Sequence, residues 1–115
     1  MHELALMTSL VDRVCEIAKN ENAKRVTDIH VKRGELSGVI PESLEFCFDI
    51  CVADTIAADS NFHIRDIAAK WRCDSCENII AKVEDLSVPI CPECGNYKLT
   101  LIEGREFQLD SIEVE

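Results

Sequence analysis

The sequence is poor in aromatic residues and has no long apolar run. Aromatic side chains make up 5% of its 115 residues, so a hydrophobic core must consist mainly of Leu, Ile, Val and Ala. No stretch approaches the roughly 18 consecutive apolar residues of a membrane-spanning helix. The first residues have neither the basic segment nor the continuous apolar segment of a secretory signal peptide. We therefore expect a cytoplasmic protein that does not associate with membranes.

Positive charge is also scarce. The chain has 12 Lys and Arg residues against 22 Asp and Glu residues, which gives a formal net charge of −10. The electrostatic field of a protein with this negative net charge repels the phosphate backbone of nucleic acids and attracts cations and basic protein surfaces. We therefore expect no nucleic-acid partner.

Cysteine, by contrast, is abundant, with seven residues. In a reducing compartment an odd number favours metal ligation and buried thiols over complete disulfide pairing. Two C-x-x-C turns, Cys73 to Cys76 and Cys91 to Cys94, are separated by residues 77–90. Two such turns supply the four sulfur ligands of a tetrahedral Zn²⁺ ion. Because four thiolates leave no position for a catalytic water, we predict a structural zinc site.

Two alternatives exist for these turns, a redox C-x-x-C motif and a pair of disulfides. A redox motif is single and opens a helix after a strand, which does not describe this pattern. The other three thiols, Cys15, Cys47 and Cys51, lie on or near predicted apolar helix faces. There a free cysteine behaves as a small hydrophobic residue. The alternative for these three is a second thiolate cluster.

Apolar periodicity predicts two helices and three strands outside the cysteine-rich segment. In the last predicted strand the alternation of apolar and polar residues slips by one residue, which predicts a β-bulge near Asp110 and Ser111. The predicted elements are, in order, a helix over 4–19, a strand over 26–33, a helix that starts near Pro41, a strand from Phe62 towards Trp71, and a strand over 105–115.

The simplest packing of these elements is an α+β fold. We expect a three-stranded antiparallel sheet with two helices, plus an inserted zinc-ribbon module with four cysteine ligands. Residues 1–70 and 104–115 would form a discontinuous α+β domain, and residues 71–103 would form the zinc-ribbon domain on two linkers.

The N-terminus is a candidate for a different metal. The terminal amine, the His2 amide nitrogen and the His2 imidazole can form neighbouring chelate rings, which suit square-planar Ni²⁺ or Cu²⁺. Glu3 adds an amide and a carboxylate within reach. The alternative is that a histidine stands at position 2 by chance.

Several segments together resemble the HypA family, the nickel-insertion accessory proteins of [NiFe]-hydrogenase maturation. The resemblance runs from the first residue to the last, with every segment in order. The segments are Met1-His2-Glu3-Leu4, Gly34-Glu35-Leu36-Ser37-Gly38-Val39, the two C-x-x-C turns, Gly104-Arg105-Glu106 and Ser111-Ile112-Glu113-Val114-Glu115.

This resemblance implies a nickel metallochaperone and not an enzyme. It implies Ni²⁺ as cargo bound by Met1, His2 and Glu3, with His2 as the essential side chain. It also implies Zn²⁺ at Cys73, Cys76, Cys91 and Cys94. The implied partners are the GTPase HypB and the hydrogenase large-subunit precursor, with urease as a further recipient in some members. We expect a monomer or a weak homodimer.

Two other functions are possible for a zinc-ribbon protein. A nucleic-acid-binding ribbon needs basic and aromatic residues around its turns, but these turns carry Asp74, Glu77 and Glu93. A zinc hydrolase needs an open coordination position and a general base, which four thiolates do not leave. We interpret His30 and His63 as ordinary half-exposed strand residues.

Overall fold

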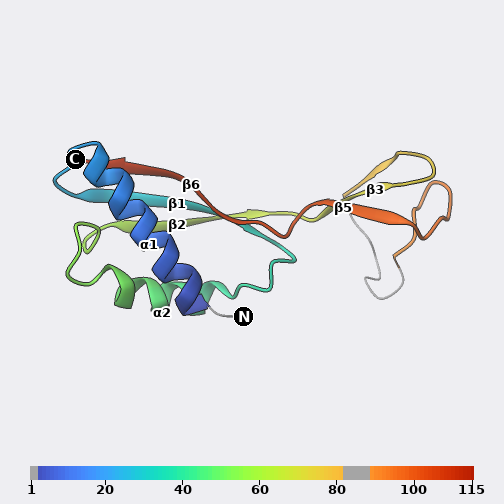
Figure 1. The fold of residues 1–115 in the computed structure, drawn as a ribbon. Helices are drawn as coiled ribbons and strands as arrows, with labels where there is room; N and C mark the ends of the chain where they lie inside the picture. Colours follow the sequence, from blue (N-terminus) through green and yellow to red (C-terminus); the bar gives the residue numbers. More distant parts are fainter. Residues whose placement is uncertain (1–2, 82–88) are drawn as a thin grey trace.

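Two helices and six strands form the part of the chain that the structure describes. The computed structural model describes residues 3–81 and 89–115. The predicted order of helices and long strands is confirmed, and Pro41 stands in the first turn of the second helix (Figure 1). Within these residues no helix has the length and apolar character to cross a membrane. The elements are α1 (Glu3–Asn20), β1 (Val26–Gly34), α2 (Pro41–Val52), β2 (Asn61–Ile67), β3 (Lys70–Cys73), β4 (Ile79–Ile80), β5 (Leu99–Glu103) and β6 (Phe107–Val114).

The three long strands form a mixed sheet in the order β2-β1-β6. Strand β6 is antiparallel to β1, as expected, but β2 is parallel to β1, so the prediction of a fully antiparallel sheet is wrong for this pair. The reason is α2, which carries the chain back across the sheet between β1 and β2, and such a crossover makes the two strands parallel. We call this sheet with α1 and α2 the α+β lobe.

The bulge predicted in the last strand is confirmed. Ser111 pairs with His30 and Leu109 pairs with Val31, so Asp110 is the extra residue on β6. The bulge lets Leu109 and Ile112 both face the helices although they differ in phase.

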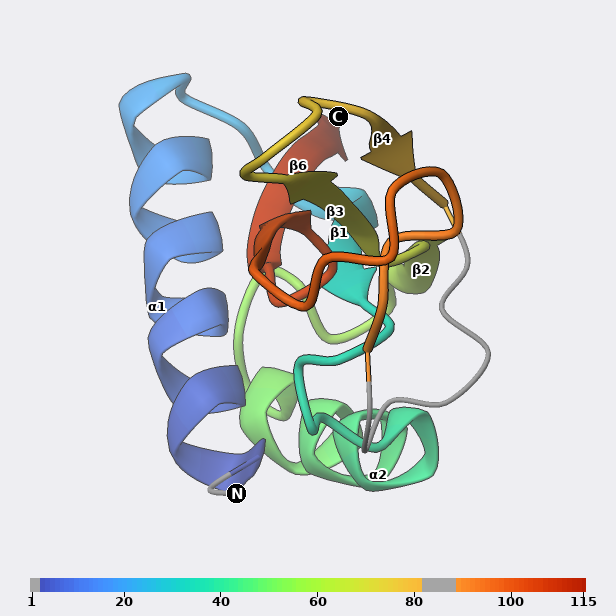
Figure 2. The same ribbon diagram turned by 90° about the vertical axis from the view of Figure 1, so that its right-hand side faces the viewer.

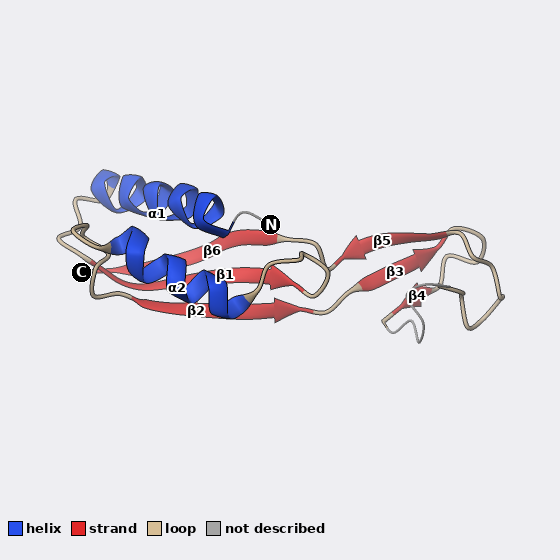
Figure 3. Cartoon of the chain, turned by 90° about the horizontal axis from the view of Figure 1, so that it is seen from below, coloured by secondary structure: helices blue, strands red, loops and turns tan. Residues whose placement is uncertain are grey.

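The core of the α+β lobe lies between the two helices and one face of the sheet (Figure 3). Met7 of α1, Leu44 of α2 and Ile29 of β1 are completely buried. The rings of Phe48 and Phe62 stack beside them, with centroids 4.7 Å apart. Aliphatic side chains therefore supply most of this core, as the scarcity of aromatic residues requires.

The remaining strands form a second, antiparallel sheet in the order β4-β3-β5. We call this sheet with the two cysteine turns the ribbon lobe. It extends from one end of the α+β lobe (Figure 1) and lies in front of that lobe when the molecule is viewed along its long axis (Figure 2); the molecule measures 55 × 25 × 17 Å. The radius of gyration is 17.9 Å, against about 13 Å for a compact chain of this size. The ribbon lobe has a small core of its own, formed by Cys73, Ile80 and Cys91 with Trp71 and Leu99 packed against them.

Backbone contacts fix the segment that returns from the ribbon lobe to the end of β1 in the α+β lobe. The Gly34 N–H donates to the Glu106 carbonyl, and the Leu36 N–H donates to the Gly104 carbonyl, both at 2.6 Å. A Cβ atom at Gly34 would overlap the backbone of Gly104, so this approach requires glycine. Two of the segments singled out in the sequence, 34–39 and 104–106, thus meet at the junction of the lobes.

Candidate metal centre

The two cysteine turns have the same backbone geometry. In the first turn the Cys73 N–H donates to the Asn78 carbonyl at 2.9 Å, and the Glu77 N–H donates to the Cys73 carbonyl at 2.8 Å. The second turn repeats both bonds at the equivalent positions, each at 2.9 Å. The residue after the second cysteine has a positive φ in both turns, 62° at Glu77 and 74° at Gly95. Local hydrogen bonds therefore fold each turn around its pair of thiols.

The four thiols of these turns form a single cluster. Their sulfur atoms all lie within 4.8 Å of one another, with 3.5 Å between Cys73 and Cys94 and 3.7 Å between Cys76 and Cys91. Sulfur ligands at about 2.3 Å from a tetrahedral Zn²⁺ ion lie about 3.8 Å from each other, so the spacing fits zinc. Disulfide sulfurs lie about 2.05 Å apart, which these pairs do not match.

Backbone N–H groups lower the pKa of the first thiol in each turn. The Cys76 amide lowers the pKa of Cys73 to about 7, and the Cys94 amide lowers the pKa of Cys91. The Asn78 amide also acts to lower the pKa of Cys76, but burial and the neighbouring sulfurs raise it to about 12. The pKa of Cys94 is likewise raised by its neighbours against a backbone N–H that lowers it. Thiolates this close repel one another, so all four ionise only around a dication.

Side chains outside the cluster link the first turn to the second turn and to β5. Asn96 Nδ2 of the second turn donates to Ser75 Oγ of the first turn at 2.6 Å, and Thr100 Oγ1 of β5 donates to Asp74 Oδ1 at 2.7 Å. These bonds hold the first turn against the second turn and against β5. The cluster consists of four sulfur donors, and among the described residues no fifth metal-binding group joins it, so it has the composition of a structural site.

The remaining cysteines have the hydrophobic role predicted for them. Cys15, Cys47 and Cys51 are half-buried and pack against the core of the α+β lobe. In the described part of the chain these three thiols do not gather into a metal-binding group. The alternative of a second thiolate cluster is therefore not supported.

The predicted nickel residues lie at the start of the chain, and Met1 and His2 are outside the described residues. Glu3 begins α1 and lines a hollow of about 440 Å³ together with residues at the start of α2, among them Glu42 and Cys47. The Glu3 Oε2 atom is buried and has no hydrogen-bond partner among the described residues. A buried carboxylate oxygen is costly unless a donor or a cation meets it.

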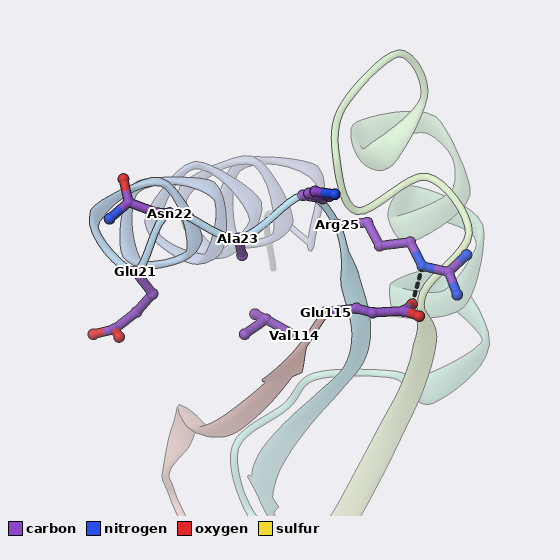
Figure 4. Close-up of a pocket in the computed structure, with 7 residues that line it drawn as sticks. Glu21, Asn22, Ala23, Arg25, Val114 and Glu115 are labelled. Carbon is purple, nitrogen blue, oxygen red and sulfur yellow. Dashed lines mark hydrogen bonds and ion pairs between the residues drawn. The ribbon is translucent and has the colours of Figure 1, made fainter.

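A second hollow, of about 540 Å³, lies where the end of α1 meets the C-terminal residues (Figure 4). Arg25 forms an ion pair with Glu115, and the Lys24 N–H donates to the Glu115 carbonyl at 2.8 Å. These contacts fix the end of β6 to the start of β1. The hollow thus belongs to the structural contact that joins residues 24–25, before β1, to the C-terminal residue Glu115.

The structure brings together two histidines that the sequence interpretation kept apart. His30 and His63 are direct partners on the parallel strands β1 and β2, and their rings stack with centroids 4.5 Å apart. Strand alternation placed each on the polar face, but only the parallel register shows that they are neighbours. The helix between these strands was the available signal for their parallel direction, but not for the register that pairs the two histidines.

Fold and site together define a two-lobed metal-binding protein with a four-cysteine ribbon. A model of the family described as "Hydrogenase/urease nickel incorporation, metallochaperone, hypA" matches residues 1–114. The chain belongs to this HypA family of nickel metallochaperones.

Similar proteins cover the whole chain. It is 36% identical over 115 residues to "Hydrogenase maturation factor HypA" of Prosthecochloris aestuarii, with all of both proteins covered. It is 33% identical over 115 residues to the protein of the same name from Chlorobium luteolum, with 100% of this chain and 97% of that protein covered. The fold is similar to the solution structure of the Ni metallochaperone HypA from Helicobacter pylori, with a TM-score of 0.70 and 24% identity over 99% of this chain and 97% of that one.

Proposed function

We propose that this chain carries Ni²⁺ on Met1, His2 and Glu3 and delivers it during maturation of a [NiFe]-hydrogenase, with urease as a possible second recipient. The chain acts as a carrier and catalyses no reaction of its own. Membership of the nickel metallochaperone family supports this function most directly. The ribbon zinc shapes the molecule and takes no part in carrying the cargo.

The environment of Glu3 supports a cation at this end of the chain. Its buried Oε2 atom lacks a donor among the described residues, so a bound metal ion or a coordinated group would remove the cost of burying it. Glu42 lies in the same hollow and adds negative charge. Both effects favour Ni²⁺ over an apolar ligand.

The proposed donors also explain how the cargo is released. Backbone amide nitrogens must lose their protons to bind nickel, so protons compete with the metal and affinity falls as the pH falls. One imidazole and main-chain nitrogens at a chain end are easily exchanged for the ligands of a recipient. A carrier requires such reversibility.

The partners follow from the family and from charge. We propose that a HypB-type GTPase and the hydrogenase large-subunit precursor bind this chain in the cytoplasm. The net charge of −10 favours contact with basic protein surfaces and disfavours nucleic acid. We also propose that residues 71–103 fold as one domain and that residues 1–70 with 104–115 fold as the other.

The connection between the lobes supports coupling of the ribbon to nickel binding. Gly34 and Leu36 are bonded to the segment that returns from the ribbon lobe, and α2 begins a few residues later at Pro41. The first turn of α2 lines the hollow that contains Glu3. A change in the ribbon therefore has a short path to the nickel end, through these two hydrogen bonds and the segment that leads into α2.

Calorimetric titration with Ni²⁺ tests the nickel site. We expect the untagged protein to bind nickel and to show the absorption of square-planar Ni²⁺, and the His2→Ala variant to lose that absorption and the binding event that produces it, because its imidazole donor is gone. One residue added before Met1 moves the terminal amine away and should alter both the affinity and the spectrum.

One residue added after Glu115 is the matched control and should change neither. Zinc content should stay constant in all forms. Full nickel affinity with an unchanged spectrum in a protein whose terminal amine is blocked and whose His2 is replaced by alanine would contradict the proposed site.

A further inference from the structure

The face of the α+β sheet that points away from the helices carries two histidines and two carboxylates in contact. The Nε2 atom of His63 lies 2.8 Å from Asp28 Oδ1, and the Nε2 atom of His30 lies 3.5 Å from Glu113 Oε2. The two rings are stacked at an angle of 12°. Glu113 is the partner of Asp28 in the β1–β6 register. Four side chains of types that commonly bind metals thus lie side by side on three strands, although their donor atoms do not converge as the four sulfurs of the ribbon lobe do.

We propose that His30, His63, Asp28 and Glu113 form a second metal site, which binds a divalent transition-metal ion. Two imidazole nitrogens and two carboxylate oxygens are a donor set suited to Zn²⁺, Ni²⁺ or Cu²⁺. The two carboxylates carry a charge of −2, which one dication neutralises. The site is separate from the four cysteines, which lie in the ribbon lobe, and does not depend on the N-terminal residues.

The sheet register holds these four side chains at adjacent positions. His30 is opposite His63 across the β1–β2 pair, and Asp28 is opposite Glu113 across the β1–β6 pair. The Nε2 atom of each imidazole faces a carboxylate, so the nitrogen and oxygen donor atoms lie next to each other. The rigid part of the site is therefore the backbone of three paired strands.

Metal binding requires the two rings to leave their stacked arrangement, because the in-plane lone pairs of two nearly parallel imidazoles do not converge on one ion. Neighbouring strands lie about 4.8 Å apart, whereas two nitrogens bound to one tetrahedral zinc ion lie about 3.4 Å apart. The donor atoms are more widely spread than the four sulfurs, so the imidazoles must tilt towards each other. The side chains of His30 and His63 are 35% and 47% exposed, which leaves them room to do so.

The charges on this face leave the two carboxylates available to a cation. A hydrogen bond with His63 lowers the pKa of Asp28 to about 2, so this carboxylate is ionised at neutral pH. Lys32 and Arg65, one row further along the sheet, pair with Asp110 at 3.5 and 3.7 Å. In the described part of the chain no Lys or Arg side chain forms a salt bridge with Asp28 or Glu113.

The His2→Ala protein with zinc already in its ribbon is the appropriate form for a test. The chain has three histidines, so this variant retains only His30 and His63. Zn²⁺ is titrated in, with calorimetry for stoichiometry and NMR for the imidazole nitrogens. We expect one further equivalent of zinc to bind and the signals of both rings to shift together.

Three variants then identify the ligands. His30→Gln and His63→Gln should each weaken this binding by at least about tenfold, since loss of even a residue that only hydrogen-bonds to a metal ligand has that effect, and the double variant should abolish it. The Lys32→Gln, Arg65→Gln double variant alters the next row of the same face and should retain the site.

Three results would overturn the proposal. They are an absence of extra zinc binding, a shift of only one ring, and unchanged affinity in the histidine double variant. The N-terminal nickel site is already removed in the His2→Ala background, so this outcome is independent of the proposed function.

Discussion

Glu77 and Gly95 occupy the same position in the two cysteine turns, and both have a left-handed backbone conformation. This conformation costs an L-residue with a side chain about 1–2 kcal/mol, whereas glycine adopts it readily. We therefore predict that Glu77→Gly stabilises the zinc-bound ribbon by about 0.5–1 kcal/mol and that Gly95→Glu destabilises it by about 1 kcal/mol or more. Competition for zinc with a chelator of known affinity measures both effects.

Asp54 provides the control for this residue-scale prediction. It also has a positive φ, 62°, but it lies in the α+β lobe beyond α2. Asp54→Gly should leave the competition for zinc unchanged. Equal zinc affinities for the Glu77→Gly and Gly95→Glu proteins would show that the backbone of the turns does not control the site.

Single residues were also where the sequence was most informative. The four cysteines could be assigned because the C-x-x-C spacing brings two thiols together within one local turn, independently of the rest of the fold. The contact between His30 and His63 could not be predicted in this way, because it depends on pairing between strands that are distant in the sequence. Glu3 was proposed from N-terminal chemistry, but the burial of its carboxylate oxygen depends on tertiary packing.

At the scale of elements, the pairing of β1 and β2 was the main difference from expectation. The helix between the two strands was predicted, and a strand-helix-strand sequence favours parallel pairing. The prediction of an antiparallel sheet was made without taking this helical connection into account. The bulge at Asp110, in contrast, followed directly from the slip in alternation, because alternation determines which face each side chain occupies.

The junction between the lobes yields a prediction at this scale. A Cβ atom at Gly34 would overlap the backbone of Gly104, and neither strand end can move away without breaking their hydrogen bonds. We expect Gly34→Ala to lower the free energy of unfolding of the α+β lobe by about 2–3 kcal/mol, the upper part of the roughly 1–3 kcal/mol that overpacking typically costs. Urea denaturation followed by the helical circular-dichroism signal measures it.

Gly38→Ala is the matched control. Gly38 has φ +77° but no atom of the described residues within 4 Å of an added Cβ, so alanine there meets only the conformational cost of about 1 kcal/mol. If Gly34→Ala proves no more destabilising than Gly38→Ala, close packing does not hold the junction together.

At the scale of the whole molecule, the two lobes differ in what stabilises them. The α+β lobe has a core of thirteen buried residues, whereas the buried core of the ribbon lobe, within the described residues, consists of Cys73, Ile80 and Cys91. Two of those three are metal ligands, so without zinc the ribbon lobe has almost no apolar core to stabilise it. The ribbon lobe should therefore depend on its metal, and the α+β lobe should not.

Two spectroscopic signals separate the lobes. Trp71, the single tryptophan, packs in the ribbon lobe, and both helices of the described chain belong to the α+β lobe. Removing zinc with a chelator should expose Trp71 and shift its emission to longer wavelength, while the helical circular-dichroism signal is retained. Simultaneous loss of both signals would mean that the two lobes unfold as one cooperative unit.

Cys91→Ser should reproduce the zinc-free state without a chelator, and Cys15→Ser should retain both zinc and the native emission, because Cys15 packs against the α+β core.

The Cys91→Ser protein then tests whether unfolding of the ribbon lobe affects nickel binding at the N-terminus. Because the return strand from the ribbon is bonded to Gly34 and Leu36 just before α2, unfolding the ribbon should change the nickel affinity measured by calorimetry. Unchanged nickel affinity in Cys91→Ser, with Cys15→Ser as reference, would show that the junction joins the lobes without coupling their metals.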